Sequence, residues 1–168
     1  MKDPRQGVGA RVVTENNDCA RNRPADAKQN LESPMTDSTL PEALHAWHRL
    51  VSNPDRDTLR SLLSEDIVFR SPAMYKPKHG REAVEMFLWA ALSVLAPSIQ
   101  YHHEWIDRDD NSAVLLFTAD VAGREVNGVD IVRWGPDNRL TEFTVMIRPL
   151  QGLQTVIGAI GEQLEADR

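Results

Sequence analysis

The sequence predicts an α+β fold, with helices and one short strand first, then a run of antiparallel strands, and a helix at the end. Two patterns indicate this. Between residues 99 and 147, four strand-like segments are separated by turn sequences. On either side of this region, apolar residues recur at helical spacing instead. A strongly curved sheet with helices across its concave face leaves a pocket between the two layers.

Four helices are expected from the spacing of apolar residues and from terminal signals. The first begins near Pro41, because Thr39 and Glu42 have the spacing of a capping box and proline favours the first helical turn. The second covers residues 57–63, and the third covers residues 81–95. The last is indicated by apolar residues three or four positions apart, namely Leu150, Leu153, Ile157, Ile160 and Leu164.

Five strands are expected. The first covers residues 67–72 and is followed by a loop from Ala73 to Gly80, in which proline and glycine interrupt regular structure. The others form an antiparallel meander, because short turn sequences connect each strand to the next. They cover residues 99–107, 113–121, 124–134 and 140–147.

The composition excludes several classes of protein. The chain has 168 residues, which suits one domain with a buried core, and its net charge of -6 argues against general nucleic-acid binding. No apolar run reaches the length of a membrane span, and residues 1–10 lack the apolar segment of a signal peptide. Cys19 is the only cysteine, so no intrachain disulfide or thiolate metal cluster can form. We expect a cytoplasmic protein with no membrane or nucleic-acid partner.

Residues 1–34 differ in composition from the rest of the chain. They contain no aromatic residue and show no helical or strand periodicity. Such a segment lacks the apolar area that offsets the entropy of ordering a chain. Two interpretations remain open: a disordered tail, or an extension that precedes a true start at Met35. In both, the predicted domain covers residues 35–168.

Three segments resemble the nuclear transport factor 2-like superfamily, in particular its SnoaL-like branch. They are Leu62-Leu-Ser-Glu-Asp-Ile-Val-Phe-Arg-Ser-Pro, Gly80-Arg-Glu-Ala-Val, and Gly128-Val-Asp-Ile-Val-Arg-Trp with the following Arg139-Leu-Thr-Glu-Phe. Their order and spacing carry the resemblance, which spans residues 40–164. The resemblance implies a cone in which a bent antiparallel sheet wraps around three N-terminal helices and encloses a deep apolar cavity, with a C-terminal helix. It also implies a homodimer, since many members are homodimers.

The resemblance implies a protein that binds a small apolar or carbonyl-containing molecule. The superfamily includes ketosteroid isomerases, polyketide cyclases, epoxide hydrolases, dehydratases and non-catalytic binding proteins. Two functions therefore remain open. The first is an isomerase, cyclase or dehydratase that performs acid/base chemistry next to a carbonyl and needs no cofactor. The second is a non-catalytic ligand-binding or dimeric interaction module of the same fold.

The chain is similar in spacing to the ketosteroid isomerases. These enzymes place a tyrosine on the first helix, a basic aspartate directly before the proline of the first strand, and a further aspartate on a later strand. The three positions fall on Trp47, Ser71 and Asp130. Only the last keeps its chemical group, because an indole does not ionise usefully and a hydroxyl is a poor general base. Ser71 thus favours the binding module, and Asp130 favours the enzyme.

Asp130 is a carboxylate between Val129 and Ile131, in the apolar middle of the strand at residues 124–134, so it must be satisfied, neutralised or used. Alternation along the strand at residues 99–107 predicts that Tyr101, His103 and Trp105 point toward the cavity. We expect Asp130 to act as acid or base, with His103 as its partner and proton relay. Alternatively, Asp130 only orders the pocket through a bond to His103 or Trp47, and His103 has no catalytic role.

The other candidate site residues are expected to contact the ligand. Trp47, Trp105 and Trp134 suit a flat, apolar molecule, and Tyr75 lies in a loop that is a candidate flap over the pocket. The full set of expected ligand-binding residues is Trp47, Ser71, Tyr75, Tyr101, Trp105, Phe117, Val132, Trp134, Phe143 and Val145. No metal site is predicted, because the histidines lack the spacing of a familiar ligand set.

The opposite face of the predicted sheet is also apolar. It carries Val129, Ile131, Met146 and Leu116, which is a large apolar area for a curved sheet to leave in water. The sequence therefore predicts a homodimer that forms through this face.

Overall fold

The structure is a computed structural model and describes residues 40–167. The predictions for the first 34 residues, for a start at Met35 and for capping by Thr39 lie outside the described residues. Within the described part, the elements are α1 (Glu42–Ser52), α2 (Arg56–Leu62), β1 (Leu63–Arg70), β2 (Lys78–His79), α3 (Arg81–Leu95), β3 (Gln100–Asp107), β4 (Ser112–Val121), β5 (Arg124–Trp134), β6 (Leu140–Arg148) and α4 (Leu150–Ala166).

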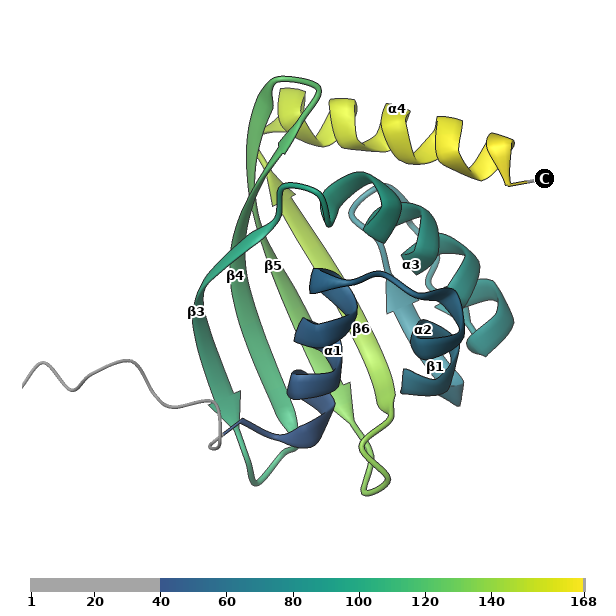
Figure 1. The fold of residues 1–168 in the computed structure, drawn as a ribbon, viewed down its shortest axis with the longest axis vertical. Coiled ribbons are helices and arrows are strands. Elements are labelled where there is room, and N and C mark those ends of the chain that lie inside the picture. Colours follow the sequence, from purple (N-terminus) through teal and green to yellow (C-terminus); the bar gives the residue numbers. More distant parts are fainter. Residues whose placement is uncertain (1–39, 168) are drawn as a thin grey trace, which may run out of the picture. The chain divides into compact units, whose positions relative to one another are not determined.

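The predicted α+β class with a C-terminal helix is confirmed. The bounds of α3 and β5 are those predicted, and the other predicted helices and strands are present with shifted ends. The strands form one sheet in the order β2-β1-β6-β5-β4-β3, and α1, α3 and α4 lie on its concave side (Figure 1). The structure adds a parallel pairing of β1 with β6 and the two-residue strand β2.

The turn between β4 and β5 sets the register of the sheet around Asp130. Ala122 and Gly123 have φ values of 51° and 75°, as in the tight turns whose twist matches paired strands. The register that follows places Asp130 opposite Leu115 on β4, and opposite Val145 on β6. A shift of one residue would turn Asp130 to the other face of the sheet. This hairpin therefore keeps the carboxylate on the concave side.

Two apolar clusters hold the helices on the sheet. The larger one joins α1, α2 and α3 to the concave face, with Leu44, Leu59 and Phe143 fully or almost fully buried. The smaller one joins the end of α3 and the beginning of α4 to β4 and β5. At Gly152 of α4, an added Cβ atom would lie 2.5 Å from Val126, so this glycine permits the close packing of α4 on the sheet.

Strand β3 departs from simple alternation. Tyr101 pairs with Phe117, but His103 rather than His102 pairs with the next residue, Leu116. The extra residue is a β-bulge, and it reverses which side chains point toward the helices after it. His103 and Trp105 therefore lie on the outer face and are exposed. Their predicted orientation toward the cavity is wrong for this reason.

No helix in the described part of the chain has both the length and the apolar character needed to cross a bilayer.

Candidate functional site

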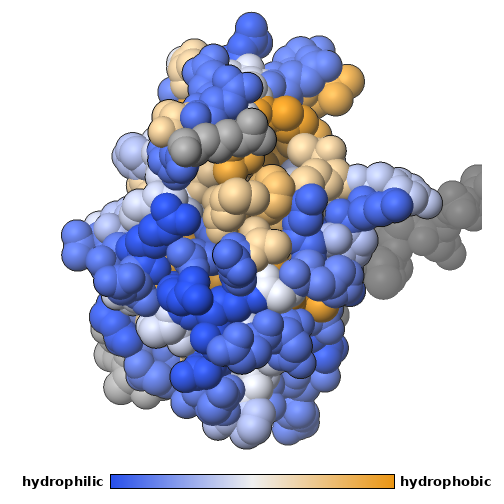
Figure 2. Space-filling view, turned by 90° about the vertical axis from the view of Figure 1, so that its right-hand side faces the viewer, coloured by the Kyte–Doolittle hydropathy of each residue, from blue (hydrophilic) through white to orange (hydrophobic). Residues whose placement is uncertain are grey.

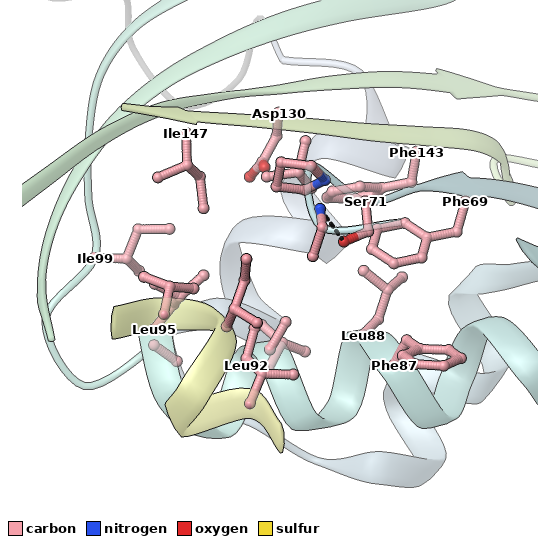
Figure 3. Close-up of a pocket in the computed structure, with 18 of the residues that line it drawn as sticks. Phe69, Ser71, Phe87, Leu88, Leu92, Leu95, Ile99, Asp130, Phe143 and Ile147 are labelled. Carbon is pink, nitrogen blue, oxygen red and sulfur yellow. Dashed lines mark hydrogen bonds between the residues drawn. The ribbon is translucent and has the colours of Figure 1, made fainter. Parts of the chain in front are cut away.

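An apolar cavity lies between the concave face of the sheet and helices α3 and α4. Its volume is about 320 Å³, which lies in the range of small-molecule sites. Its wall also includes residues of α1, the end of β1 and the segment 71–74 that follows it. Aliphatic and aromatic side chains from these elements surround the space (Figure 3). The polar side chains that line it are those of Trp47, Ser71, Tyr101 and Asp130.

Three of these polar residues form a hydrogen-bonded chain across three elements. The Trp47 indole Nε1 on α1 donates to the Tyr101 hydroxyl on β3 over 2.9 Å. The Tyr101 hydroxyl in turn donates to Asp130 Oδ2 on β5 over 2.7 Å. Within residues 40–167, no other group donates to the Asp130 carboxylate. Its Oδ1 atom therefore accepts no hydrogen bond from the described part of the chain.

Aromatic packing holds the Tyr101 ring in place. The ring meets Phe117 nearly at right angles, with 6.1 Å between centroids, and also meets the His48 ring edge-on at 5.2 Å. Phe117 occupies the space above Gly128, where an added Cβ atom would lie 2.3 Å from the phenylalanine ring. The glycine therefore makes room for Phe117, and Phe117 supports Tyr101.

Burial controls the protonation of Asp130. Its side chain lies in the sheet with 5% of the residue exposed. Desolvation raises its pKa from 3.8 to about 7, and the hydrogen bond from Tyr101 acts in the opposite direction. Burial, followed by the neighbouring Asp130 charge, raises the pKa of Tyr101 well above 10.0. At neutral pH, Tyr101 thus stays a donor while Asp130 exchanges between acid and carboxylate.

The partner of Asp130 is Tyr101 and not His103. The Nδ1 atom of His103 lies 2.7 Å from the carbonyl oxygen of His102, and its ring packs edge-on against Trp105 outside the cavity. Since the bulge in β3 lies directly after Tyr101, this tyrosine keeps the inward orientation that His103 loses. Trp47 reaches Asp130 only through Tyr101, and not by the direct bond considered from the sequence.

The expected ligand-binding residues separate into three groups. Phe143 and Val145 line the cavity with Trp47, Ser71 and Tyr101. Phe117, Val132 and Trp134 lie on the concave side of the sheet but are buried outside the cavity lining, the last two in the larger core cluster. Tyr75 and Trp105 are exposed and do not line the cavity.

The residues of the loop after β1 that reach the cavity lie at its beginning and do not include Tyr75. Tyr75 is 101% exposed, whereas Ser71, Pro72, Ala73 and Met74 line the cavity. The Ser71 Oγ atom accepts a hydrogen bond from the Ala73 backbone over 3.1 Å (Figure 3). This bond tightens the turn, so the beginning of the loop reaches the cavity while its tip points into solvent.

The sequence did not identify α3 and α4 as cavity walls. Leu88, Leu92, Leu153 and Ile160 were visible as members of apolar helix faces, and all four line the cavity. Helical periodicity shows that a face is buried but not whether it packs on other side chains or surrounds a space. Within residues 40–167, no group of three His, Cys, Asp or Glu side chains is arranged to hold a metal ion.

The raised pKa of Asp130 predicts a specific pH dependence of stability. Below pH 4 the Asp130 side chain is protonated in both the folded and the unfolded chain, so its burial does not lower the free energy of unfolding through ionisation. Between pH 4 and about 7 only the unfolded chain releases its proton readily, so the free energy of unfolding falls as pH rises. The shift from 3.8 to about 7 corresponds to a loss of about 4 kcal/mol above neutrality.

Asp130→Asn should remove this loss and keep an acceptor for Tyr101. Chemical denaturation at pH 4 and pH 8 measures the free energy of unfolding of both proteins. The difference between the variant and the wild type should shift in favour of the variant by several kcal/mol from pH 4 to pH 8, by about 4 kcal/mol at most. Asp66→Asn, at an exposed strand position, is the matched control and should show no such gain. An equal stability difference at both pH values for Asp130→Asn would contradict a raised pKa.

Comparison with known proteins places this geometry in a family. A steroid delta-isomerase from Pseudomonas aeruginosa is 38% identical, with a TM-score of 0.69 over 74% of this chain and 90% of that chain. An uncharacterised protein with a cystatin-like fold from Silicibacter pomeroyi is 22% identical, with a TM-score of 0.67 over 74% of this chain and 86% of that chain.

A third similar structure is the epoxide hydrolase/cyclase-like enzyme SalBIII, which acts in pyran ring formation in the polyether salinomycin. It is 17% identical, with a TM-score of 0.54 over 66% of this chain and 91% of that chain, and at this identity it supports the fold alone. No curated protein matches the chain. The model of the SnoaL-like domain matches residues 44–143, more than half of the chain, and the protein therefore belongs to the SnoaL-like domain family.

Proposed function

We propose that the protein is a cofactor-independent isomerase that moves a proton next to the carbonyl group of a small apolar substrate. The observation that carries the proposal is Asp130, a buried carboxyl in an apolar cavity with a pKa of about 7. A general acid/base works best when its pKa lies near the working pH. The similarity to a steroid delta-isomerase, at 38% identity, supports the same reaction class.

The proposed reaction needs one group that both accepts and returns a proton. Ionised Asp130 takes a proton from the carbon next to the carbonyl, and the electron pair of the broken C–H bond forms an enolate. Asp130 then returns the proton to another carbon of the conjugated system, so substrate and product are isomers and the carboxylate is restored. The net reaction consumes no oxidant, reductant or cofactor.

Three neighbouring residues support this cycle. Tyr101 donates a hydrogen bond to Oδ2 of Asp130, so Oδ1 is the oxygen that contacts the substrate. Trp47 donates to the tyrosine hydroxyl and fixes its orientation. Ser71 accepts from the Ala73 backbone and donates to no group in the described part of the chain, so its hydroxyl hydrogen can stabilise the enolate oxygen. Ser71 thus serves as a donor at the position where the similar isomerases have a base.

A second candidate function is ligand binding without catalysis. It is favoured by the single carboxylate, Asp130, among the described residues that line the cavity. Ser71 does not replace the missing base, since a hydroxyl does not accept protons effectively at neutral pH. In this alternative, Asp130 anchors a polar group of the ligand and transfers no proton.

Proton exchange with deuterated water separates the two functions. We expect the wild type to accelerate loss of the α-proton signal, in nuclear magnetic resonance spectra, from enolisable ketones and β,γ-unsaturated cyclohexenones. The rate should rise with pH and level off above about 7, as Asp130 becomes ionised. Asp130→Asn should lower it by about 100-fold or more, the usual contribution of a general base.

Tyr101→Phe provides the diagnostic variant for the same assay. Without the donor that lowers the pKa of Asp130, the midpoint of the pH profile should move to higher pH while exchange persists. Binding of these ketones by the wild type without any accelerated exchange would favour the binding module and overturn the isomerase.

The proposed assembly is a homodimer through the outer face of the sheet. Two neighbouring rows across β3 to β6 form an apolar patch, the outer patch: Trp105, Val114, Leu116, Val129, Ile131 and Met146. Trp105 is 55% exposed and Met146 is 57% exposed. Polar pairs flank the patch, with Arg70 and Glu142 on one side and Arg148 and Asn127 on the other. An apolar centre with a polar rim is typical of protein interfaces.

Met146→Glu should separate the dimer, because a carboxylate buried in an apolar interface loses its hydration without a partner. Light scattering at micromolar concentration should show a dimer for the wild type and a monomer for the variant. Met86→Glu, on an exposed methionine of α3, is the control and should remain dimeric. A monomeric wild type, or a dimeric Met146→Glu variant, would rule out this interface.

A further inference from the structure

The buried residues of helix α4 lie in its first half. Its buried residues are Gly152 and Val156, which pack near Val126 and the end of α3. The second half has an apolar stripe, with Ile157, Ile160 and Leu164 at helical spacing, and this stripe lines the cavity. The α4 stripe and Asp130 thus belong to one continuous space.

The two ends of this space differ in chemistry. The end at the sheet contains Asp130, Tyr101 and Trp47, linked by hydrogen bonds. The end between α3 and α4 has only apolar side chains in its lining, among them Leu95, Ile160 and Leu164. Figure 2 shows apolar surface exposed at the height of α4 and the upper part of α3, framed by hydrophilic side chains. A ligand that fills the cavity therefore has a polar group at one end only.

We propose that the substrate is a carbonyl compound whose apolar tail leaves the cavity between α3 and α4. This inference rests on the proposed function for the position of the carbonyl at Asp130. The tail lies along the α4 stripe, where each buried methylene group adds to affinity without needing a polar partner. The stripe of α4 then determines how long a tail the protein accepts.

Gly161 is the residue that opens this path. It lines the cavity between Ile157 and Leu164 on the α4 stripe, and it has no side chain to fill the space. A Cβ atom added there meets nothing within 4 Å beyond the adjacent residues and the backbone of its own helix, so the glycine is not required by packing. Glycine lowers the stability of a helix interior, and its presence here instead leaves room for a ligand.

The test compares two ketones that differ in tail length, 2-heptanone and 2-undecanone, in competition with the fluorescent probe N-phenyl-1-naphthylamine. The wild type should bind the longer ketone more tightly, by about fourfold for each added methylene group that is buried. The dissociation constant of Gly161→Leu for 2-heptanone should stay within about twofold of the wild-type value. Its dissociation constant for 2-undecanone should rise by about tenfold or more, which corresponds to the loss of roughly two buried methylene groups.

Gly158→Leu is the matched control. Gly158 is exposed, lies outside the cavity lining and also has open space around an added Cβ atom. The two variants therefore gain similar helix propensity, and only Gly161→Leu occupies the tail path. Circular dichroism confirms that each variant is folded. Gly158→Leu should bind both ketones as the wild type does.

Three outcomes overturn the proposal: equal weakening of both ketones by Gly161→Leu, the same effect from Gly158→Leu, or no binding of either ketone by the wild type. These results are distinct from failure of the isomerase. Length-dependent binding without proton exchange would retain the tail site and remove the catalytic function. Proton exchange with no dependence of binding on tail length would retain the isomerase and remove the tail site.

Discussion

The site depends on one balance, between the cost of burying the Asp130 carboxylate and the hydrogen bond that Tyr101 donates to it. Burial disfavours the charged form, and the tyrosine recovers part of that cost. Burial is the larger effect, so the acid titrates near neutrality instead of near its ordinary value. The same balance gives the protein a proton donor and acceptor at the end of an apolar cavity and lowers its stability when the carboxylate ionises.

Much of the remaining fold serves to hold this pair. The β4–β5 turn sets the strand register that turns Asp130 inward. The absence of a side chain at Gly128 admits Phe117, whose ring supports Tyr101. Trp47 then closes the arrangement from α1 by donating to the tyrosine hydroxyl. Because these contacts come from four elements, the geometry of the acid depends on the whole sheet and its helices being assembled.

Local patterns in the sequence were sufficient to predict most of the elements, because alternation and turn chemistry are local properties. The inward position of Asp130 also needed the family resemblance, since alternation shows which residues share a face but not which face is covered. They did not predict the parallel pairing of β1 with β6, which joins distant segments and leaves no periodic signal. The bulge in β3 was also hidden, since one inserted residue does not change the composition of a strand. That single residue moved His103 outward and left Tyr101 as the partner of Asp130.

The cavity walls could be predicted only in part, for a related reason. Phe143 and Val145 were placed correctly because they alternate on the strand paired with Asp130. Val132 and Trp134 share the face of Asp130, but they pack in the core with residues of α1, and no sequence pattern shows where a helix stops covering a sheet. The cavity stripe of α4 was recognised as an apolar face but could not be assigned to a cavity.

The most direct test of this account is the titration of Asp130 itself. Carbon-13 nuclear magnetic resonance of the aspartate side-chain carboxyls, with Asp130→Asn to assign the signal, follows its protonation without reference to any substrate. We expect a midpoint at about pH 7 in the wild type and a higher midpoint in Tyr101→Phe, which lacks the donor to the carboxylate. A wild-type midpoint near the ordinary value of 3.8 would contradict the account, because Asp130 would then be too weak a base to move protons at neutral pH.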